Sequence, residues 1–253
     1  DHPEGDDNTY DNYSGSAGVP IGNHWQRIAA AIYLADPRLL NTGALTEDSK
    51  LLLRRDVKER VRTIAPFLTL MGEPYLVSVP LEESATGYEK DQHQYWIVDG
   101  FTTSRTVPYA ATLPDGRPLR YLRNSVKAIV DAYNGTVHLY INEPSDPIIQ
   151  GWANLFPQLF ETLDSMPANL RAHMMVPQAQ FELQVQQLLR YHVTSPRIFY
   201  SGDDVWQVPL ELYGEKQIPV SPYHITAQVK PSTESEFLLL QPLTPLARPN
   251  LSA

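Results

Sequence analysis

The dipeptide Asn134-Gly135, flanked on both sides by β-branched and aromatic residues, constrains the fold of this chain more than any other feature. Both residue types tolerate the positive φ angles of a tight turn between antiparallel strands. The pattern therefore predicts a β-hairpin whose strands span 126–133 and 136–141. Apolar and polar residues alternate in the returning strand, which predicts that one of its faces is buried.

Other segments show the spacing that is typical of strands or helices. Runs rich in β-branched and aromatic residues predict strands at 75–79, 95–98, 224–229 and 236–240. Apolar residues at helical spacing predict helices from an Asn23 cap, after Thr46, after Asp146-Pro147, from Pro167 and from Pro177. We expect the strands near 75–80 and 95–98 to share a sheet with the hairpin, and residues 196–220 to be irregular with Trp206 as an anchor.

Helices and strands are grouped along the chain and do not alternate strictly. This grouping indicates an α+β fold, with a mixed or antiparallel sheet, a central hairpin at 126–141 and several short helices packed on it. The first 22 residues form a predicted extended acidic arm, because they contain five acidic residues and neither Lys nor Arg. Residues 23–253 are then one α+β domain, within which 146–192 is a candidate helical subdomain.

Composition argues against several functional classes. The net charge of −9 and the lack of a basic patch argue against a nucleic-acid partner. The absence of cysteine excludes disulfides, thiolate nucleophiles and cysteine-based metal sites. No apolar run is long enough to span a bilayer. Because the chain begins without Met, we expect it to be an excised piece of a longer protein.

We predict no metal site and no cofactor. The histidines lack the spacing of a zinc site, His173 and His192 being too far apart in sequence. His192, at a predicted helix end, is interpreted as a partner of the helix dipole or as a packed aromatic ring. The acidic stretch at 6–12 superficially suggests calcium binding, but it lacks the glycine and the terminal glutamate of an EF-hand loop. Weak calcium binding there stays an open alternative.

One polar constellation is the candidate ligand site: Asp99, Thr102, Thr103 and Arg105. Asp99 follows an apolar strand and Gly100 permits a sharp turn after it. A carboxylate beside hydroxyls and a guanidinium is suited to a polar ligand or a cation. The alternative is a structured turn, in which Asp99 accepts backbone and threonine hydrogen bonds and Arg105 pairs with a carboxylate.

The candidate catalytic residues are the carboxylates Asp99, Asp131 and Asp203, with Asp204 beside the last. Asp131 interrupts an apolar strand, and burial there would raise its pKa toward that of a general base. The alternative is that Asp131 faces solvent or pairs with Arg123 or Lys127. The motifs GxGxxG, GxxxxGK[ST], HExxH and GxSxG are absent, so whether the chain is an enzyme stays open.

Aromatic residues in the central block offer a further alternative. They are candidates to line a carbohydrate or lipid groove, although aromatic residues in strands are more often part of a core. The residues concerned are Trp96, Phe101, Tyr109, Tyr121, Tyr133 and Tyr140.

Several blocks of sequence, in order, resemble uncharacterised protein family number 0182. They include GVPIG at 18–22, RRDVKERV at 54–61, YWIVDGFTTS at 95–104, LRNSVKAIVDAYNGTV at 122–137 and RYHVTSPRIFY at 190–200. The family comprises bacterial multi-pass membrane proteins of unknown function. The resemblance implies a periplasmic or extracellular domain, joined to the cell membrane by a transmembrane segment absent from these residues. It supplies no catalytic residues.

Three functional hypotheses follow. The first is a soluble extracytoplasmic scaffold or binding domain, with an envelope component or a protein as its partner. The second is an envelope-associated hydrolase that acts on a lipid, a glycan or a peptide. The third is a partner-binding module that uses an exposed edge strand or the N-terminal arm.

Overall fold

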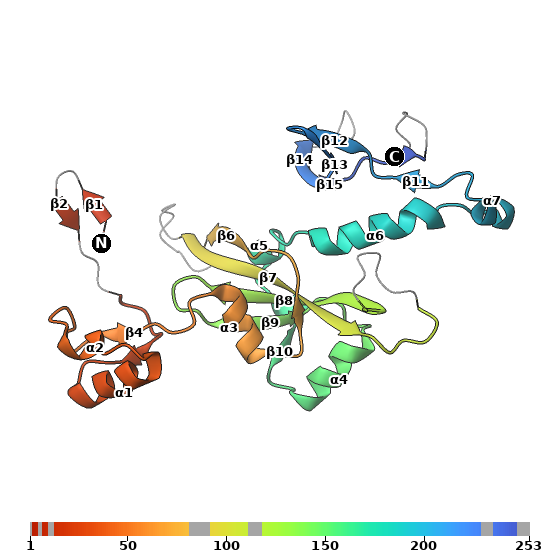
Figure 1. Cartoon of the computed structure of the whole chain (residues 1–253). Coiled ribbons are helices and arrows are strands. Elements are labelled where there is room, and N and C mark those ends of the chain that lie inside the picture. The colour runs from red at the N-terminus through yellow and green to blue at the C-terminus, as the bar shows by residue number, and fades with distance from the viewer. Residues whose placement is uncertain are drawn as a thin grey trace.

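The computed structural model describes residues 2–4, 7–9, 13–80, 92–110, 118–228 and 235–246 (Figure 1). Its helices are α1 (His24–Leu34), α2 (Arg38–Asn41), α3 (Val57–Ile64), α4 (Pro147–Leu155), the 3₁₀ helix η1 (Leu163–Ser165), α5 (Ala168–Arg171), α6 (Gln178–Tyr191) and α7 (Pro196–Ser201). Within these described ranges, no helix has the length and apolar character needed to cross a membrane.

A sheet of six strands forms the centre of the molecule, in the order β10-β9-β8-β7-β5, with β6 also paired to β7. These strands are β5 (Thr69–Leu70), β6 (Tyr75–Pro80), β7 (Gln92–Ser104), β8 (Tyr121–Asp131), β9 (Val137–Ile141) and β10 (Phe160–Thr162). All pairs are antiparallel except β9 and β10, which are parallel. The predicted α+β fold with a mixed sheet is confirmed, and β6 and β7 share the sheet with the hairpin as expected.

Among the residues that the structure describes, five two-stranded pairs lie outside this sheet, and all are antiparallel. They are β1 (His2–Glu4) with β2 (Asp7–Thr9), β3 (Val19–Pro20) with β4 (Lys50–Leu51), β11 (Trp206–Gln207) with β16 (Thr244–Pro245), β12 (Leu210–Tyr213) with β13 (Lys216–Pro219), and β14 (Tyr223–Ala227) with β15 (Glu236–Leu240). The prediction of an irregular segment at 196–220 is therefore wrong, since it contains α7, β11, β12 and β13.

The central hairpin is confirmed, but its turn differs from the predicted one. Gly135 has a positive φ of 69°, whereas Asn134 does not have a positive φ. The connection spans residues 132–136, and the Asp131 carboxylate accepts hydrogen bonds from the backbone amides of Tyr133 and Asn134, each at 2.7 Å. The Asp131 side chain thus fixes a turn that is longer than a two-residue hairpin.

The sheet is covered on both faces. On one, the α3/α4 face, Val61 of α3 and Ile149 of α4 pack against a core that includes Leu139 of β9. On the other, the α5 face, Leu170 of α5 packs against a core that includes Tyr140 of β9. The predicted burial of the Val137, Leu139 and Ile141 face of the returning strand is confirmed. Tyr140 on its other face is buried as well, in the second core.

The strand β7 passes through Asp99 and Gly100 without turning, contrary to the predicted strand end. The β7–β8 register shifts between Gly100 and Phe101, because Ser125 is an extra residue on β8. A Cβ atom on Gly100 would lie 3.0 Å from Leu68 Cδ1 and 3.2 Å from Val126 Cβ. Glycine is needed here for close packing on the α3/α4 face.

The second predicted helix also begins later than expected. Residues Lys50–Leu51 pair with Val19–Pro20 as strands, and Arg54 has a φ of 50°, which interrupts helical geometry. Helix α3 then begins at Val57, where the Asp56 carboxylate caps it by accepting a 2.7 Å hydrogen bond from the Glu59 amide. By contrast, the predicted Asn23 cap of α1 is confirmed. The Gln26 amide donates to Asn23 Oδ1, and the Asn23 amide donates in return to Gln26 Oε1.

The described end of the predicted acidic arm contacts the central hairpin. The Tyr13 hydroxyl and the Ser16 amide both donate to Asn134 Oδ1, at 3.3 and 2.9 Å. The Tyr13 and Tyr133 rings lie 5.0 Å apart between centroids. Part of the acidic stretch at 6–12, including Asp6 and Asp11, lies outside the described residues, so the calcium alternative stays untested.

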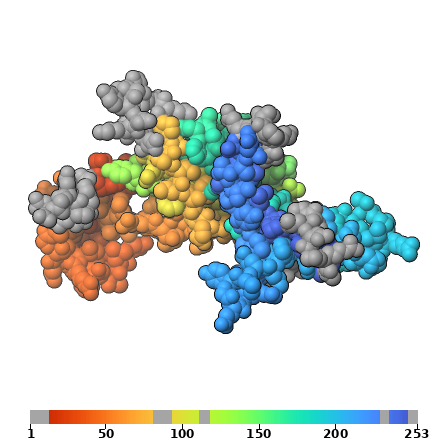
Figure 2. Space-filling view, turned by 90° about the horizontal axis from the view of Figure 1, so that it is seen from above, coloured from red at the N-terminus to blue at the C-terminus, as the bar shows by residue number. Residues whose placement is uncertain are grey.

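The N-terminal and C-terminal parts lie at opposite ends of the sheet. Figure 2 shows the orange region of α1 and α2 on one side of the yellow strands, and the blue and cyan C-terminal region on the other side. Within the described residues beyond Ser201, only Leu243 and Thr244 are buried. The described core of the molecule therefore lies almost entirely in and around the central sheet.

Candidate functional site

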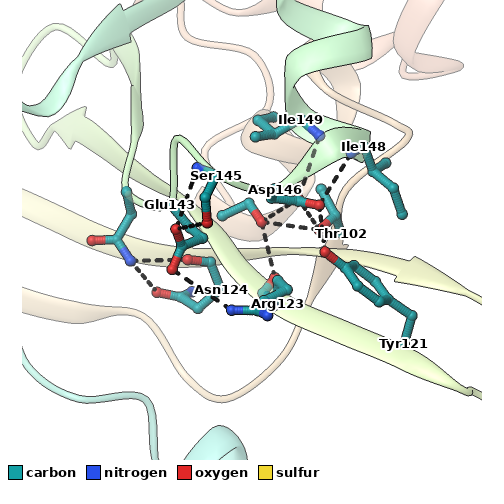
Figure 3. A network of polar contacts seen from close by, with 11 residues as sticks. Thr102, Tyr121, Arg123, Asn124, Glu143, Ser145, Asp146, Ile148 and Ile149 are labelled. Carbon is teal, nitrogen blue, oxygen red and sulfur yellow. Dashed lines mark hydrogen bonds and ion pairs between the residues drawn. The ribbon is translucent and has the colours of Figure 1, made fainter.

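A buried carboxylate, Asp146, forms the centre of the polar network in Figure 3. Asp146 precedes Pro147 and is the N-cap of α4, accepting hydrogen bonds from the amides of Ile148 at 3.1 Å and Ile149 at 3.3 Å. An aspartate before a proline at the first helical position is a favourable helix start. The cap anchors α4 to the α3/α4 face of the sheet.

Three hydroxyl groups from the central strands converge on the same carboxylate. Thr102 of β7 donates at 2.5 Å, Ser125 at the β8 bulge at 2.6 Å, and Tyr121 at the start of β8 at 2.6 Å. Asp146 is only 1% exposed. A carboxylate has about four lone-pair sites, so these five donors saturate it.

The electrostatics of this cluster favour an ionised Asp146. Burial raises the pKa of Asp146, but hydrogen bonds from Ser125, Thr102, Tyr121 and the Ile148 amide outweigh burial, so the net pKa is lowered. Burial, together with the hydrogen bond to Asp146 and the charge of that carboxylate, raises the pKa of Tyr121 to about 12. A saturated carboxylate with a lowered pKa is suited to joining a helix to a sheet, and poorly suited to accepting a substrate proton.

A second buried polar cluster lies on the α5 face. Lys127 of β8 donates to Asp99 Oδ1 of β7 at 2.5 Å and to the Met175 carbonyl at 2.9 Å. Asn124 Nδ2 donates to the same Asp99 oxygen at 3.1 Å. Close by, the Tyr75 hydroxyl accepts a hydrogen bond from the Met175 amide at 3.0 Å. Burial raises the pKa of Tyr75 to about 12. The hydrogen bond with Met175 acts in the opposite direction, and the charge of Asp99 raises the pKa further.

The structure does not bring together the four residues predicted to bind a ligand. Asp99 is engaged on the α5 face, whereas Thr102 bonds to Asp146 on the α3/α4 face. Thr103 Oγ1 lies 3.2 Å from Thr69 Oγ1 of β5, and Arg105 is exposed just past the end of β7. The alternative of a structured turn at Asp99 is wrong, because this residue pairs with Lys127 within the sheet.

Asp131 lies at the end of β8, where its carboxylate is engaged by the turn and by a histidine. His93 Nε2 lies 2.8 Å from Asp131 Oδ2. Burial raises the pKa of Asp131, but the amides of Asn134 and Tyr133 and the contact with His93 outweigh it, so the net pKa is lowered. The expected upward shift toward a general base is therefore not found. The proposed partners Arg123 and Lys127 are replaced by His93.

The remaining acidic candidates lie in the C-terminal region. Asp203 accepts a hydrogen bond from Ser201 Oγ at 2.7 Å. The neighbouring Asp204 lies 4.0 Å from His192 Nε2, and the His192 ring stacks on Trp206 with centroids 3.8 Å apart. The prediction that His192 is a packed aromatic ring and that Trp206 is an anchor is confirmed. In the part of the chain that the structure describes, no three acidic or histidine side chains form a group suited to a metal ion.

The six aromatic residues considered for a ligand groove do not line a common one. Trp96 and Tyr133 line a cavity of about 350 Å³ beside the 132–136 connection. Phe101 and Tyr140 are buried and Tyr109 is fully exposed. A different groove, of about 830 Å³, lies between the C-terminal ends of α3 and α4. Its aromatic residues include Phe67, Trp152 and Phe156. The spacing of Trp152 and Phe156 by four on an apolar helix face is the sequence signal that points to it.

The comparisons with known proteins point to one group. The sequence model of Uncharacterised protein family (UPF0182) matches residues 1–253. A "UPF0182 protein" of Synechococcus sp. (strain CC9311) is 73% identical over 252 residues, which is 100% of this chain and 27% of that protein. A "UPF0182 protein" of Prochlorococcus marinus (strain MIT 9313) is 68% identical over 253 residues, 100% of this chain and 26% of that protein. The match to a relative in Synechococcus elongatus is 45% over 253 residues, with the same coverage. No solved structure matches the chain.

Proposed function

The chain belongs to the uncharacterised protein family UPF0182, and from this premise we propose that it is a non-catalytic scaffold or binding domain of a longer polypeptide. The chain spans 27% of the length of the Synechococcus relative that it matches, which supports a longer parent protein. The resemblance of this chain to a family of multi-pass membrane proteins supports placing this domain on the extracytoplasmic side of the cell membrane. An envelope component or another protein is then its expected partner.

The observation that carries the proposal is the state of the carboxylates that were candidates for catalysis. Asp99 pairs with Lys127, Asp131 with His93 and the turn amides, and Asp203 with Ser201. The first two lie at different positions along the sheet, and the third lies beyond α7. General acid and base groups must meet around one reacting bond, and these groups are engaged in separate structural contacts.

The experiment that tests this proposal compares carboxylate variants in the full-length protein. We expect Asp131→Asn and Asp203→Asn proteins to accumulate and to show no change in turnover of ester, glycoside and peptide substrates. We expect Asp146→Ala, which removes the α4 cap and leaves three hydroxyls without their acceptor, to reduce accumulation of the whole protein. If the parent protein turns over one of these substrates and a folded Asp131→Asn or Asp203→Asn protein does not, the hydrolase alternative is established instead.

The location needs a separate test. A protease added to spheroplasts that contain the full-length protein, in which the outer membrane is opened and the inner membrane is intact, should cleave within this domain. Protection until the cells are lysed would place the domain in the cytoplasm and reject the extracytoplasmic proposal. A cytoplasmic marker protein, measured in the same sample, controls for lysis.

One observation favours the partner-binding alternative. The hairpin of β12 and β13 is exposed at all eight of its strand residues. Its exposed apolar side chains are Leu210, Leu212, Tyr213 and Ile218. Isolated two-stranded hairpins are marginally stable in water, so a partner covering this one would stabilise it. A pull-down with the parent and with the Leu212→Lys and Tyr213→Lys variants would distinguish this role. A partner that the parent captures and both variants lose supports it, because these substitutions leave the central sheet unchanged.

A further inference from the structure

The groove between α3 and α4 is apolar and preformed. It is lined by residues from the end of α3 and the turn after it, and from the end of α4 and the segment after it: Thr63, Ile64, Pro66, Phe67, Trp152, Leu155, Phe156, Pro157, Gln158 and Leu159. None of these side chains is charged. A volume of about 830 Å³ is within the range of sites that hold several large side chains or a small ligand.

One wall of the groove is made of aromatic rings with nearly parallel planes. The rings of Phe67 and Trp152 stack with centroids 4.2 Å apart and an interplanar angle of 15°. Phe156 lies parallel to both, at 7° to Phe67 and 8° to Trp152. Phe67 and Trp152 also pack against the core of the α3/α4 face. The wall is therefore held by the same core that holds the sheet, and its shape does not depend on an occupant.

The rim of the groove exposes side chains that water solvates poorly. Leu155 is 63% exposed and Phe156 is 44% exposed, and both continue the apolar face of α4 beyond the core. Large apolar side chains gathered at one exposed place mark contacts with other chains or segments.

We propose that this groove receives an uncharged segment, rich in large aliphatic or aromatic side chains, from the part of the same polypeptide that lies outside residues 1–253. Two observations favour this occupant over others. The matched relatives extend far beyond the region aligned with this chain, which covers 27% of the first of them, so most of such a polypeptide is available to fill the groove. The lining has no charge, so a charged peptide or an anionic headgroup gains no electrostatic complementarity there.

The inference rests on the proposed function, because it needs the chain to be one domain of a longer protein. It adds the chemistry of the contact and its position at the ends of α3 and α4. In that arrangement Leu155 and Phe156 are buried against the occupant, while the saturated Asp146 cap fixes the start of the same helix.

Site-directed photo-crosslinking in the full-length protein tests the inference. Benzoylphenylalanine replaces Leu155 at the rim, and in a matched control replaces Asn154, an exposed α4 residue that does not line the groove. We expect the Leu155 probe to give a product of monomer mass, crosslinked to an apolar peptide outside residues 1–253, in at least severalfold higher yield than the Asn154 probe. Equal yields from the two probes would overturn the proposal, as would crosslinks to lipid, to a second copy, to another protein or only within residues 1–253.

Charge substitutions provide a second test that does not depend on the probe. Leu155→Asp and Phe156→Asp should make the full-length protein more sensitive to protease, whereas Asn154→Asp should not. Unchanged sensitivity of both groove variants contradicts the inference. Failure of the groove is separable from failure of the non-catalytic proposal, because the latter is shown by turnover that is lost in a folded Asp131→Asn or Asp203→Asn protein and not by the crosslinking yield.

Discussion

The central sheet and the C-terminal hairpins contain similar strand residues but bury them differently. On β9, Leu139 and Tyr140 are both buried, because α3 and α4 cover one face of the sheet and α5 covers the other. On β12, Leu212 and Tyr213 are both exposed. The difference shows that strand-forming sequence is not enough to make a core. A covering layer on each face is also needed, and in the described residues the β12–β13 hairpin has none.

The two regions also differ in the burial and the hydrogen-bond partners of their carboxylates. In and beside the sheet, Asp146 is buried and the Asp99 side chain is only 10% exposed, and the two carboxylates are engaged by hydroxyls and helix amides and by a lysine. In the C-terminal region, Asp203 is exposed and bonds to its near neighbour Ser201. Changes to the sheet clusters should therefore have large effects on stability, and changes to the exposed hairpin should have small ones.

The largest expected effect comes from the buried pair on the α5 face. Replacing Lys127 by Met leaves the Asp99 carboxylate buried without its cation, which should cost about 3–5 kcal/mol of unfolding free energy. Urea denaturation of the 253-residue chain measures this loss. The double variant Asp99→Leu Lys127→Met removes both charges and should recover much of it. A Lys127→Met chain as stable as the parent would show that the pair does not hold the sheet.

The next effect concerns the Asp146 cluster and depends on pH. Asp146→Asn weakens hydrogen bonds to a charged acceptor, at a cost of about 1.5–3 kcal/mol near neutral pH. The lowered pKa of Asp146 means that its ionised form stabilises the fold above the ordinary value of 3.8. That contribution is lost as the pH falls through the lower pKa of the folded state.

Thermal unfolding of the parent and of Asp146→Asn across the acidic range checks this sign. The difference in stability between them should be largest at neutral pH and should shrink below pH 3.8. A difference that grows as the pH falls would mean that Asp146 is protonated in the folded protein. In that case the account of a saturated, ionised carboxylate would be wrong.

A smaller effect is expected at the bulge of β7 and β8. Gly100→Ala places a methyl group against Leu68 and Val126, both buried, and should destabilise the chain by about 1–3 kcal/mol. Gly151, exposed on α4, is the matched control, because no atom lies within 4 Å of its added Cβ. There the same change should stabilise the chain by about 0.5–1 kcal/mol. Effects of equal sign at the two sites would contradict the packing assigned to Gly100.

The smallest effect is expected on the C-terminal hairpin. Leu212 is 75% exposed, so Leu212→Lys should change the stability of the isolated chain by less than about 0.5 kcal/mol. Leu139→Ala, in the sheet, should cost about 2–5 kcal/mol in the same denaturation experiment. A large loss in Leu212→Lys would show that the hairpin is already packed against part of this chain.

The features that could be predicted from sequence are those set by local chemistry. The Asn23 cap and the position of the 134–135 turn depend on neighbouring residues or on one strong pattern. The features that sequence did not reveal depend on long-range geometry. Asp146 binds hydroxyls from Thr102 and Tyr121, which lie 44 and 25 positions away, and only the fold places them around one carboxylate.

The candidate ligand site shows the same limit. Asp99 and Thr102 are close in sequence but belong to opposite faces of β7, because successive strand residues alternate. A strand was expected to end at Asp99, and its continuation to Ser104 separates the four residues. Burial of Asp131 suggested a raised pKa, but turn amides that no sequence pattern specified lower it instead.

The central claim is that the sheet is self-sufficient, whereas we propose that the α3/α4 groove is completed by the rest of a longer polypeptide. Amide hydrogen exchange, measured on the 253-residue chain and on the full-length protein, tests it most directly. The account predicts equal protection of β7, β8 and β9 in both, and protection of residues 155–159 that rises only in the full-length protein. Equal exchange of residues 155–159 in both proteins would contradict it.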